Sequence, residues 1–110
     1  MNEKRIDSLI SLCLRAGLLQ AGEEKCEKAL RSGDAKLVVI SRDASENTKK
    51  KFINKAFFYK TPAVIYGTKD RLGALSGRGN SASLCVTDKN LGARIKDAIE
   101  ITPLESPGGI

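Results

Sequence analysis

Residues Leu18–Ile40 read LLQAGEEKCEKALRSGDAKLVVI, and this stretch decides the fold. Leu18–Ala21 predicts a short strand, and the run Lys36–Ile40, rich in β-branched residues, predicts a strand that is covered on both faces. Gly22 and Gly33 bracket the residues in between, and glycines at such positions mark helix ends. Three apolar residues recur there at helical spacing: Cys26, Ala29 and Leu30. The stretch therefore predicts a strand, a helix and a second strand in succession.

The start of this predicted helix is suited to binding phosphate. The free amide groups of a first helical turn carry a partial positive charge, and Gly22 would let the backbone of another molecule approach closely. Lys25 and Lys28 lie on the side of the helix away from its apolar residues, with Glu24 and Arg31 beside them. For this segment taken alone, an ordinary turn followed by solvated lysines is the simpler interpretation.

The overall charge points to a polyanionic partner. The 110 residues include 19 Lys and Arg against 13 Asp and Glu, which gives a formal net charge of +6. This length suits one domain, and the hydrophobic content of 41% is that of a globular chain. We expect the domain to cover residues 1–101. Residues 102–110 carry two prolines, paired glycines and no periodicity, so we expect a mobile tail there.

Several function classes are disfavoured by the residue types present. No apolar run approaches the roughly 20 residues of a membrane span, so we expect a cytoplasmic protein with no membrane partner. Cys13, Cys26 and Cys85 are far apart in the chain and histidine is absent, so neither a metal site nor another cofactor is expected. We expect these cysteines to pack as small hydrophobes. Without histidine the usual general base is missing, and adjacent Glu23 and Glu24 diverge on a helix, so no catalytic site is predicted.

The rest of the chain alternates further helices and strands. Apolar spacing predicts a first helix over residues 4–16, and apolar runs predict strands at Ala63–Tyr66 and Ser83–Thr87. Three later helices are expected to begin after residues whose side chains can cap them: Ser45, Thr68 and Asp88. This alternation is typical of a layered α/β domain.

The helix after Ser45 carries the densest run of charge. Its expected apolar stripe is Thr48, Phe52, Ile53 and Ala56. The lysines expected to face water are Lys49, Lys50, Lys51 and Lys55. We interpret this run as a solvated face that aids solubility or attracts RNA weakly, and a dedicated site on it is the less favoured alternative.

The loop Ser76–Ser81 contains the glycine pair of Gly77-Arg78-Gly79. A dinucleotide site is not expected, because such a site needs a strand before the loop, a helix after it and a third glycine in register. Here a helix precedes the loop and a strand follows it. A flexible turn with Arg78 and small residues can instead lie against an exposed base or beside a backbone, which suits RNA with unstacked nucleotides. An ordinary surface turn is the alternative.

Several segments, taken in order, resemble a known family. They are Gly22-x-x-x-x-x-Lys28-Ala29-Leu30-x-x-Gly33, Lys36–Ile40, Ala63-x-x-Tyr66 and Leu72-Gly73-x-x-x-Gly77. Over residues 4–99 the chain is similar to the kink-turn-binding ribosomal protein superfamily of archaeal L-seven-Ae, and most of all to its bacterial YlxQ-like branch. The resemblance implies a three-layer α/β/α sandwich with a mixed four-stranded sheet. It also implies recognition of RNA kink-turns, which are sharp bends built on tandem sheared G·A pairs.

The resemblance further implies where RNA is bound. In such proteins the helix that begins at the position of Gly22 enters the groove at the G·A pairs, and the loop at the position of Arg78–Ala82 covers the flipped-out bases. Lys28 would contact a guanine edge or a phosphate. Glu24 and Lys25 stand where archaeal members commonly place Asn and Glu, so the base contacts there depart from the archaeal pattern. The RNA-binding residues predicted in this way are Gly22, Glu23, Glu24, Lys25, Lys28, Arg31, Arg78, Gly79, Asn80, Ser81 and Ala82.

The predicted function is therefore that of an RNA-binding protein that recognises and stabilises kink-turns, associated with the ribosome or with another ribonucleoprotein. It would act as a monomeric clamp that shifts the RNA toward its bent state, with phosphate contacts supplying much of the affinity and with no DNA specificity. Two alternatives stay open. One is a protein-interaction adaptor that uses the face of the Gly22 helix, and the other is an enzyme acting on nucleotides or RNA, for which no catalytic group is recognised.

Overall fold

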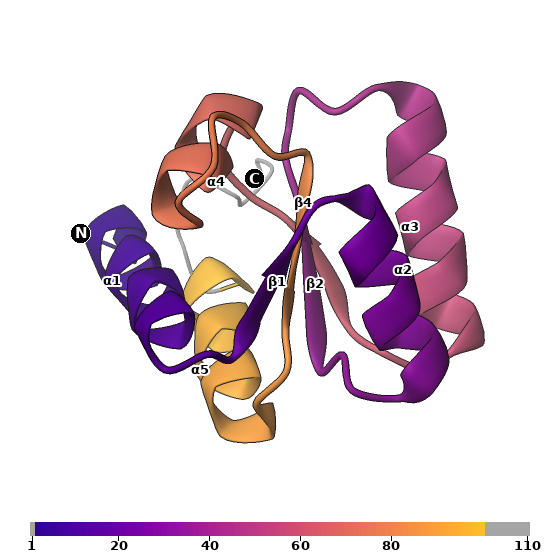
Figure 1. Ribbon diagram of the computed structural model, residues 1–110, viewed down its shortest axis with the longest axis horizontal. Coiled ribbons are helices and arrows are strands. Elements are labelled where there is room, and N and C mark those ends of the chain that lie inside the picture. Colours follow the sequence, from indigo (N-terminus) through magenta and orange to yellow (C-terminus); the bar gives the residue numbers. More distant parts are fainter. Residues whose placement is uncertain (1, 101–110) are drawn as a thin grey trace, which may run out of the picture.

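The computed structural model describes residues 2–100, which form an α/β fold of five helices and four strands (Figure 1). The tail predicted over 102–110 lies outside the described residues. The alternation of helices and strands is as predicted. In chain order the elements are α1 (Asn2–Arg15), β1 (Leu19–Ala21), α2 (Glu23–Ser32), β2 (Leu37–Ile40), α3 (Glu46–Phe58), β3 (Ala63–Ile65), α4 (Lys69–Leu75), β4 (Ser83–Val86) and α5 (Lys89–Glu100).

The strands form one mixed sheet in the order β1-β4-β2-β3. β4 pairs antiparallel with both β1 and β2, whereas β2 and β3 are parallel. Helices α2 and α3 cover one face of the sheet, and α1, α4 and α5 cover the other (Figure 1). The predicted three-layer α/β/α sandwich with a mixed four-stranded sheet is confirmed.

Each face of the sheet has its own apolar core. Leu84 and Val86 of β4 pack among the buried side chains of α1, α4 and α5. Cys85 lies between them in the strand and so points to the opposite face, where it joins Cys26 of α2 and Phe52 of α3. Because both faces are covered, a central strand must be apolar at nearly every position, and β2 and β4 are buried throughout.

Local signals in the sequence determine where the helices begin and end. Ser45, Thr68 and Asp88 each accept a backbone N–H of the following helix through a side-chain oxygen, as predicted. Gly33 ends α2 with a φ of 84°, and its N–H donates to the Leu30 carbonyl. These caps fix the helix ends around the sheet.

The apolar stripe of α3 is narrower than predicted. Phe52 and Ala56 are buried against the sheet, but Ile53 is 46% exposed. A step of one residue turns a helix by about 100°, which carries Ile53 past the contact with the strands. The prediction that Ile53 lies inside is therefore wrong.

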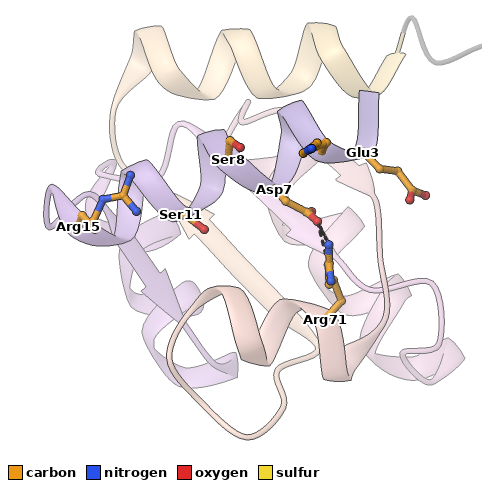
Figure 2. A pocket seen from close by; sticks show the side chains of 7 residues that line it. Glu3, Asp7, Ser8, Ser11, Arg15 and Arg71 are labelled. Atoms are coloured by element: carbon orange, nitrogen blue, oxygen red, sulfur yellow. Dashed lines mark hydrogen bonds and ion pairs between the residues drawn. The ribbon is translucent and has the colours of Figure 1, made fainter. Parts of the chain in front are cut away.

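A polar cluster joins α1 to the segment between β3 and α4. The Tyr66 hydroxyl donates to Asp7 Oδ1 at 2.8 Å, and Arg71 Nε donates to Asp7 Oδ2 at 2.8 Å. Figure 2 shows Arg71 reaching from α4 across an open groove to Asp7 on α1. Burial, followed by the hydrogen bond to Asp7, raises the pKa of Tyr66 above its ordinary value. The buried Asp7 carboxylate is thus fully paired.

Candidate nucleic-acid interface

The two segments predicted to bind RNA meet in space. A Cβ atom placed on Gly22 would lie 3.6 Å from the guanidinium carbon of Arg78, so the Arg78 side chain crosses the start of α2. The start of α2 and the connection from α4 to β4 lie together at the upper end of the sheet in Figure 1. Residues that are more than fifty positions apart in the sequence therefore share one surface.

Gly22 has a backbone conformation that other residues rarely adopt, with φ 101° and ψ 157°. Its N–H donates to the Ser83 carbonyl at 3.2 Å, and its own carbonyl accepts the Cys26 N–H at 3.0 Å. No side chain caps the helix. The first-turn amide groups of α2 therefore stay available to an anion, beside the positive charge of Arg78.

Lys25 and Lys28 line a groove next to the same helix. The groove has a volume of about 290 Å³ and lies along α2 and the edge strand β1, with Gln20 and Ser32 also in its wall. Both lysines are exposed. The prediction that Lys25 and Lys28 share one side of α2 is confirmed.

The other predicted residues of α2 do not face this groove. Glu24 and Arg31 are exposed on the outward side of the helix. Glu23 lies toward α3, where the Lys51 ammonium is 2.5 Å from a carboxylate oxygen of Glu23 and 2.5 Å from one of Glu27. The hydrogen bond from Lys51 lowers the pKa of Glu27, and the hydrogen bonds to Glu23 and Glu27 raise the pKa of Lys51. The prediction that Lys51 simply faces water is wrong, because it links the two helices.

The loop before β4 is tied to α4, whereas the sequence predicts a flexible turn. The Arg78 N–H donates to the Gly73 carbonyl at 2.7 Å, and the Ser81 N–H donates to the Lys69 carbonyl at 2.9 Å. A Cβ on Gly73 would lie only 2.3 Å from the Asn80 Cα, so only glycine fits at this helical position. The backbone that carries Arg78 is therefore held in place by α4.

The predicted RNA-binding residues of this loop differ in their exposure to solvent. Arg78, Gly79 and Asn80 are exposed, and Ala82 is half-buried. Ser81 is buried, and its hydroxyl donates to the Ser83 carbonyl at 2.8 Å. The Ser81 side chain thus stabilises the loop from its buried side and is not presented to a ligand.

Two residues that matter to this surface escaped the sequence prediction. Gly73 appears in the family-like motif, but its role depends on contact with a loop that only the tertiary structure reveals. Lys51 is one of several similar lysines in a row, and nothing local in the sequence separates it from Lys50. In both cases the signal lies in a non-local contact.

The three cysteines are buried, as predicted. Burial, with a smaller effect from Asp88, raises the pKa of Cys13 to about 11. A hydrogen bond with Cys26, together with burial, raises the pKa of Cys85. Among residues 2–100, no group of three or more His, Cys, Asp or Glu side chains is placed to hold a metal ion. No helix in that same range combines the length and the apolar character needed to cross a membrane.

Comparison with known proteins shows the relatives of this chain. A solved structure described as a protein with unknown function from Bacillus halodurans C has a TM-score of 0.82 and 33% identity, and the match covers 86% of this chain and 96% of that one. The Giardia lamblia 15.5kD RNA binding protein has a TM-score of 0.74 at 17% identity, over 94% of this chain and 88% of that one, which shows a shared fold.

Proteins similar in sequence also include one described as RNA-binding. The RNA-binding protein YlxQ of Enterococcus faecium is 32% identical over 99 residues, which span 90% of this chain and 95% of the relative. The model of the ribosomal protein L7Ae/L30e/S12e/Gadd45 family matches residues 4–96. That match covers both the α2 start and the loop before β4. The chain therefore belongs to the ribosomal protein L7Ae/L30e/S12e/Gadd45 family, with YlxQ proteins among its relatives.

Proposed function

We propose that this protein binds RNA and that it recognises and stabilises kink-turns. The observation that carries the proposal is the meeting of the Arg78 guanidinium with the uncapped start of α2 at Gly22. Free amide groups and a planar cation at one point attract phosphate, and a guanidinium can also stack on an unpaired base. Among the relatives, the Enterococcus protein is described as RNA-binding.

The groove along α2 supplies the second part of the proposed interface. Lys25 and Lys28 line it, next to the exposed edge of the sheet. Lysine contacts to phosphate give affinity without sequence preference, whereas Lys28 is also the residue proposed to reach a guanine edge. The net charge of +6 favours the approach of any RNA to this surface.

The proposed mechanism requires no chemical reaction. The start of α2 and the loop at Arg78 are held at a fixed separation, because the loop is hydrogen-bonded to α4 and Arg78 lies over Gly22. An RNA that bends can touch both contact points at once, and an extended RNA touches fewer. The protein would shift the RNA population toward the bend by the difference between its affinities for the two states. We further propose that it acts as a monomer in the cytoplasm, associated with the ribosome or another ribonucleoprotein.

A binding titration tests the proposal. A fluorescently labelled duplex that contains a consensus kink-turn is compared with the same duplex after its G·A pairs are replaced by Watson–Crick pairs. At moderate salt we expect the kink-turn to bind at least about tenfold more tightly, equivalent to about 1.4 kcal/mol. Equal affinities with the same salt dependence would leave only generic attraction of RNA to a basic protein.

The same assay tests the position of the interface. Lys28→Ala should weaken kink-turn binding by about 1–3 kcal/mol, the range of a good base contact. Lys50→Ala, which removes from α3 a charge that is also exposed, is the matched control and should lower the affinity of both duplexes slightly and equally. If Lys50→Ala were the selective variant, the interface would lie on α3.

A further inference from the structure

The end of α3 presents large apolar side chains to solvent. Phe57 is 85% exposed, Phe58 is 74% exposed and Ile53 is 46% exposed. Ile53 and Phe57 are four residues apart and so lie on one face of the helix. Phenylalanine has no polar atom that would explain such exposure, and grouped apolar side chains on a protein surface mark interaction sites.

These side chains are carried by an ordered segment. α3 ends at a turn in which Lys60 has a φ of 57° and donates its N–H to the Phe57 carbonyl at 3.1 Å. The Thr61 N–H donates to the Ala56 carbonyl at 2.8 Å. The rings of Phe58 and Tyr59 meet edge to face, with their centroids 4.9 Å apart. The backbone that carries the exposed phenylalanines is thus fixed at the end of the helix.

A basic cleft lies beside them. Its volume is about 540 Å³, and it is bounded by the turn after α2, the turn after α3 and the first turns of α5, at the lower end of Figure 1. The charged side chains that line it are Lys36, Lys60, Lys89, Lys96 and Asp97. Tyr59, which contacts Phe58, also lines it, so the cleft continues the aromatic surface.

The four lysines of the cleft differ in whether another group of the protein pairs with them. Lys36 Nζ donates to the Gly33 carbonyl, and Lys96 pairs with Glu100 at 3.1 Å. Within the part of the chain that the structure describes, neither Lys60 nor Lys89 has an ion-pair partner within 4.0 Å. The cleft therefore offers unpaired positive charge next to uncovered apolar area.

We propose that this end of the molecule is a docking surface for an acidic segment of another protein, whose aliphatic or aromatic side chains cover Ile53, Phe57 and Phe58. We call it the distal surface and define it by Ile53, Phe57, Phe58, Lys60, Lys89 and Lys96. Carboxylates of the segment pair with the lysines in the cleft, and its apolar side chains remove the exposed rings from water.

The charge and the shape of the distal surface favour an acidic protein segment over a second copy of this chain or an RNA strand. A second copy of this chain would bring lysines against lysines, since each copy carries the same basic cleft, and like charges facing each other are unfavourable. An RNA strand could stack a base on a phenylalanine ring. Ile53, however, offers no flat ring for a base, whereas it is a good contact for an aliphatic or aromatic side chain.

The distal surface lies away from the proposed RNA interface. Gly22 and Arg78 lie where β1 ends and β4 begins, and the helices α2 and α3 both run from that end of the sheet toward the other (Figure 1). Phe57, Phe58 and the cleft lie at the far ends of these helices. RNA and an acidic protein segment could then be bound at the same time, and the protein would connect the two.

Selection from a random peptide library displayed on phage tests the proposal. The library is selected in parallel on the wild-type protein and on the double variant Phe57→Ser, Phe58→Ser, which removes only exposed side chains. We expect peptides that combine Asp or Glu with apolar residues to be enriched on the wild type and lost on the variant. Absence of enrichment, or equal enrichment on both proteins, would overturn the proposal.

The best enriched peptide is then labelled and titrated by fluorescence anisotropy. Lys60→Glu with Lys89→Glu should weaken its binding by at least about tenfold, whereas Lys4→Glu with Arg5→Glu, the same charge change on α1, should leave it nearly unchanged. Leu12→Ser, at a 41% exposed residue of α1, is the matched control for the phenylalanine changes. A single-stranded RNA that binds more tightly than the peptide, and loses affinity in the phenylalanine variant, would overturn the proposal in favour of a base-stacking surface. The preference for the kink-turn duplex over the Watson–Crick duplex, measured on the same variants, should stay unchanged, which separates this proposal from the function proposed above.

Discussion

At the residue scale, the proposed interface depends on one missing side chain and one long one. Gly22 places no side chain at the start of α2, and the Arg78 guanidinium lies at contact distance, 3.6 Å, from the position that a Cβ would take. With a φ of 101°, Gly22 also has a conformation in which any other residue is strained. Glycine is thus required here by the backbone conformation, and an added methyl group would lie in contact with Arg78 at the proposed interface.

A pair of glycine substitutions separates the backbone requirement at Gly22 from its proposed role in RNA binding. Gly22→Ala and Gly17→Ala each place a Cβ on a residue with positive φ, 101° and 75°, so urea titrations should show both losing about 1–3 kcal/mol of unfolding free energy. Only at Gly22 does that Cβ meet another residue, Arg78. Kink-turn affinity should therefore fall in Gly22→Ala and stay unchanged in Gly17→Ala. If the two variants bound RNA equally well, Gly22 would have only a backbone role.

At the scale of elements, α4 supports the loop that carries Arg78. The Arg78 N–H donates to the Gly73 carbonyl and the Ser81 N–H donates to the Lys69 carbonyl, and both carbonyls belong to α4. Gly73 lets the loop backbone lie directly against the helix. The loop is short, and this support gives Arg78 a defined starting point from which its side chain reaches Gly22.

Substitution of Gly73 tests this support. Gly73→Ala brings a Cβ within 2.3 Å of the Asn80 Cα, so the loop must move away from α4. We expect a loss of about 1–3 kcal/mol of unfolding free energy, typical of overpacking, together with weaker kink-turn binding. Gly79→Ala is the stability control in the same loop and should keep its unfolding free energy, because nothing lies within 4 Å of its added Cβ. Unchanged RNA affinity in Gly73→Ala would show that the position of the loop does not matter for binding.

The helices and strands also show which features of the fold could be predicted from the sequence. Caps such as Ser45 and Gly33, and the apolar runs of β2 and β4, act over a few residues, so helix ends and buried strands could be predicted. The contact of Gly73 with Asn80 and the ion pairs of Lys51 join segments whose distance depends on the whole packing. The prediction that Ile53 is buried failed for a related reason. Periodicity gives the direction of an apolar stripe on a helix but not the width of the surface that covers it.

At the scale of the whole molecule, the helical layer of α1, α4 and α5 is held partly by the buried carboxylate of Asp7. It accepts hydrogen bonds from the Tyr66 hydroxyl and from Arg71. These contacts join α1 to the chain between β3 and α4, and α4 in turn supports the loop at Arg78. Stability of this layer and geometry of the proposed interface are therefore connected.

The raised pKa of Tyr66 predicts a pH dependence of stability. In the unfolded chain a tyrosine loses its proton near pH 10, whereas burial and Asp7 keep Tyr66 protonated in the folded protein. The unfolded state is then favoured as pH rises above about 10, and the stability that Tyr66 contributes declines. Tyr66→Phe should cost about 1.5–3 kcal/mol at neutral pH, the value of a hydrogen bond to a charged group.

Urea titrations of wild type and Tyr66→Phe across this pH range give the measurement. The gap between their unfolding free energies should narrow as pH rises above about 10, because only the wild type carries the Tyr66 hydroxyl. The two proteins differ at this one residue, so the contributions of all other groups are common to both and cancel in the comparison. A gap that stays constant or widens would show that the Tyr66 hydroxyl is not held in its protonated form.

Energy transfer across a kink-turn measures directly whether the proposed interface at Gly22 and Arg78 holds RNA in a bent state. The RNA carries a donor at one end and an acceptor at the other, and protein is added without divalent metal, so that bending depends on the protein. We predict that wild type drives the ends together at low protein concentration, and that Arg78→Ala, at an exposed residue of the loop, needs a higher concentration to do so. Circular dichroism and urea titration of Arg78→Ala confirm that the variant is folded. Wild-type protein that binds the RNA without bringing its ends together would contradict the account, and superimposable curves for the two proteins would remove the loop from the interface.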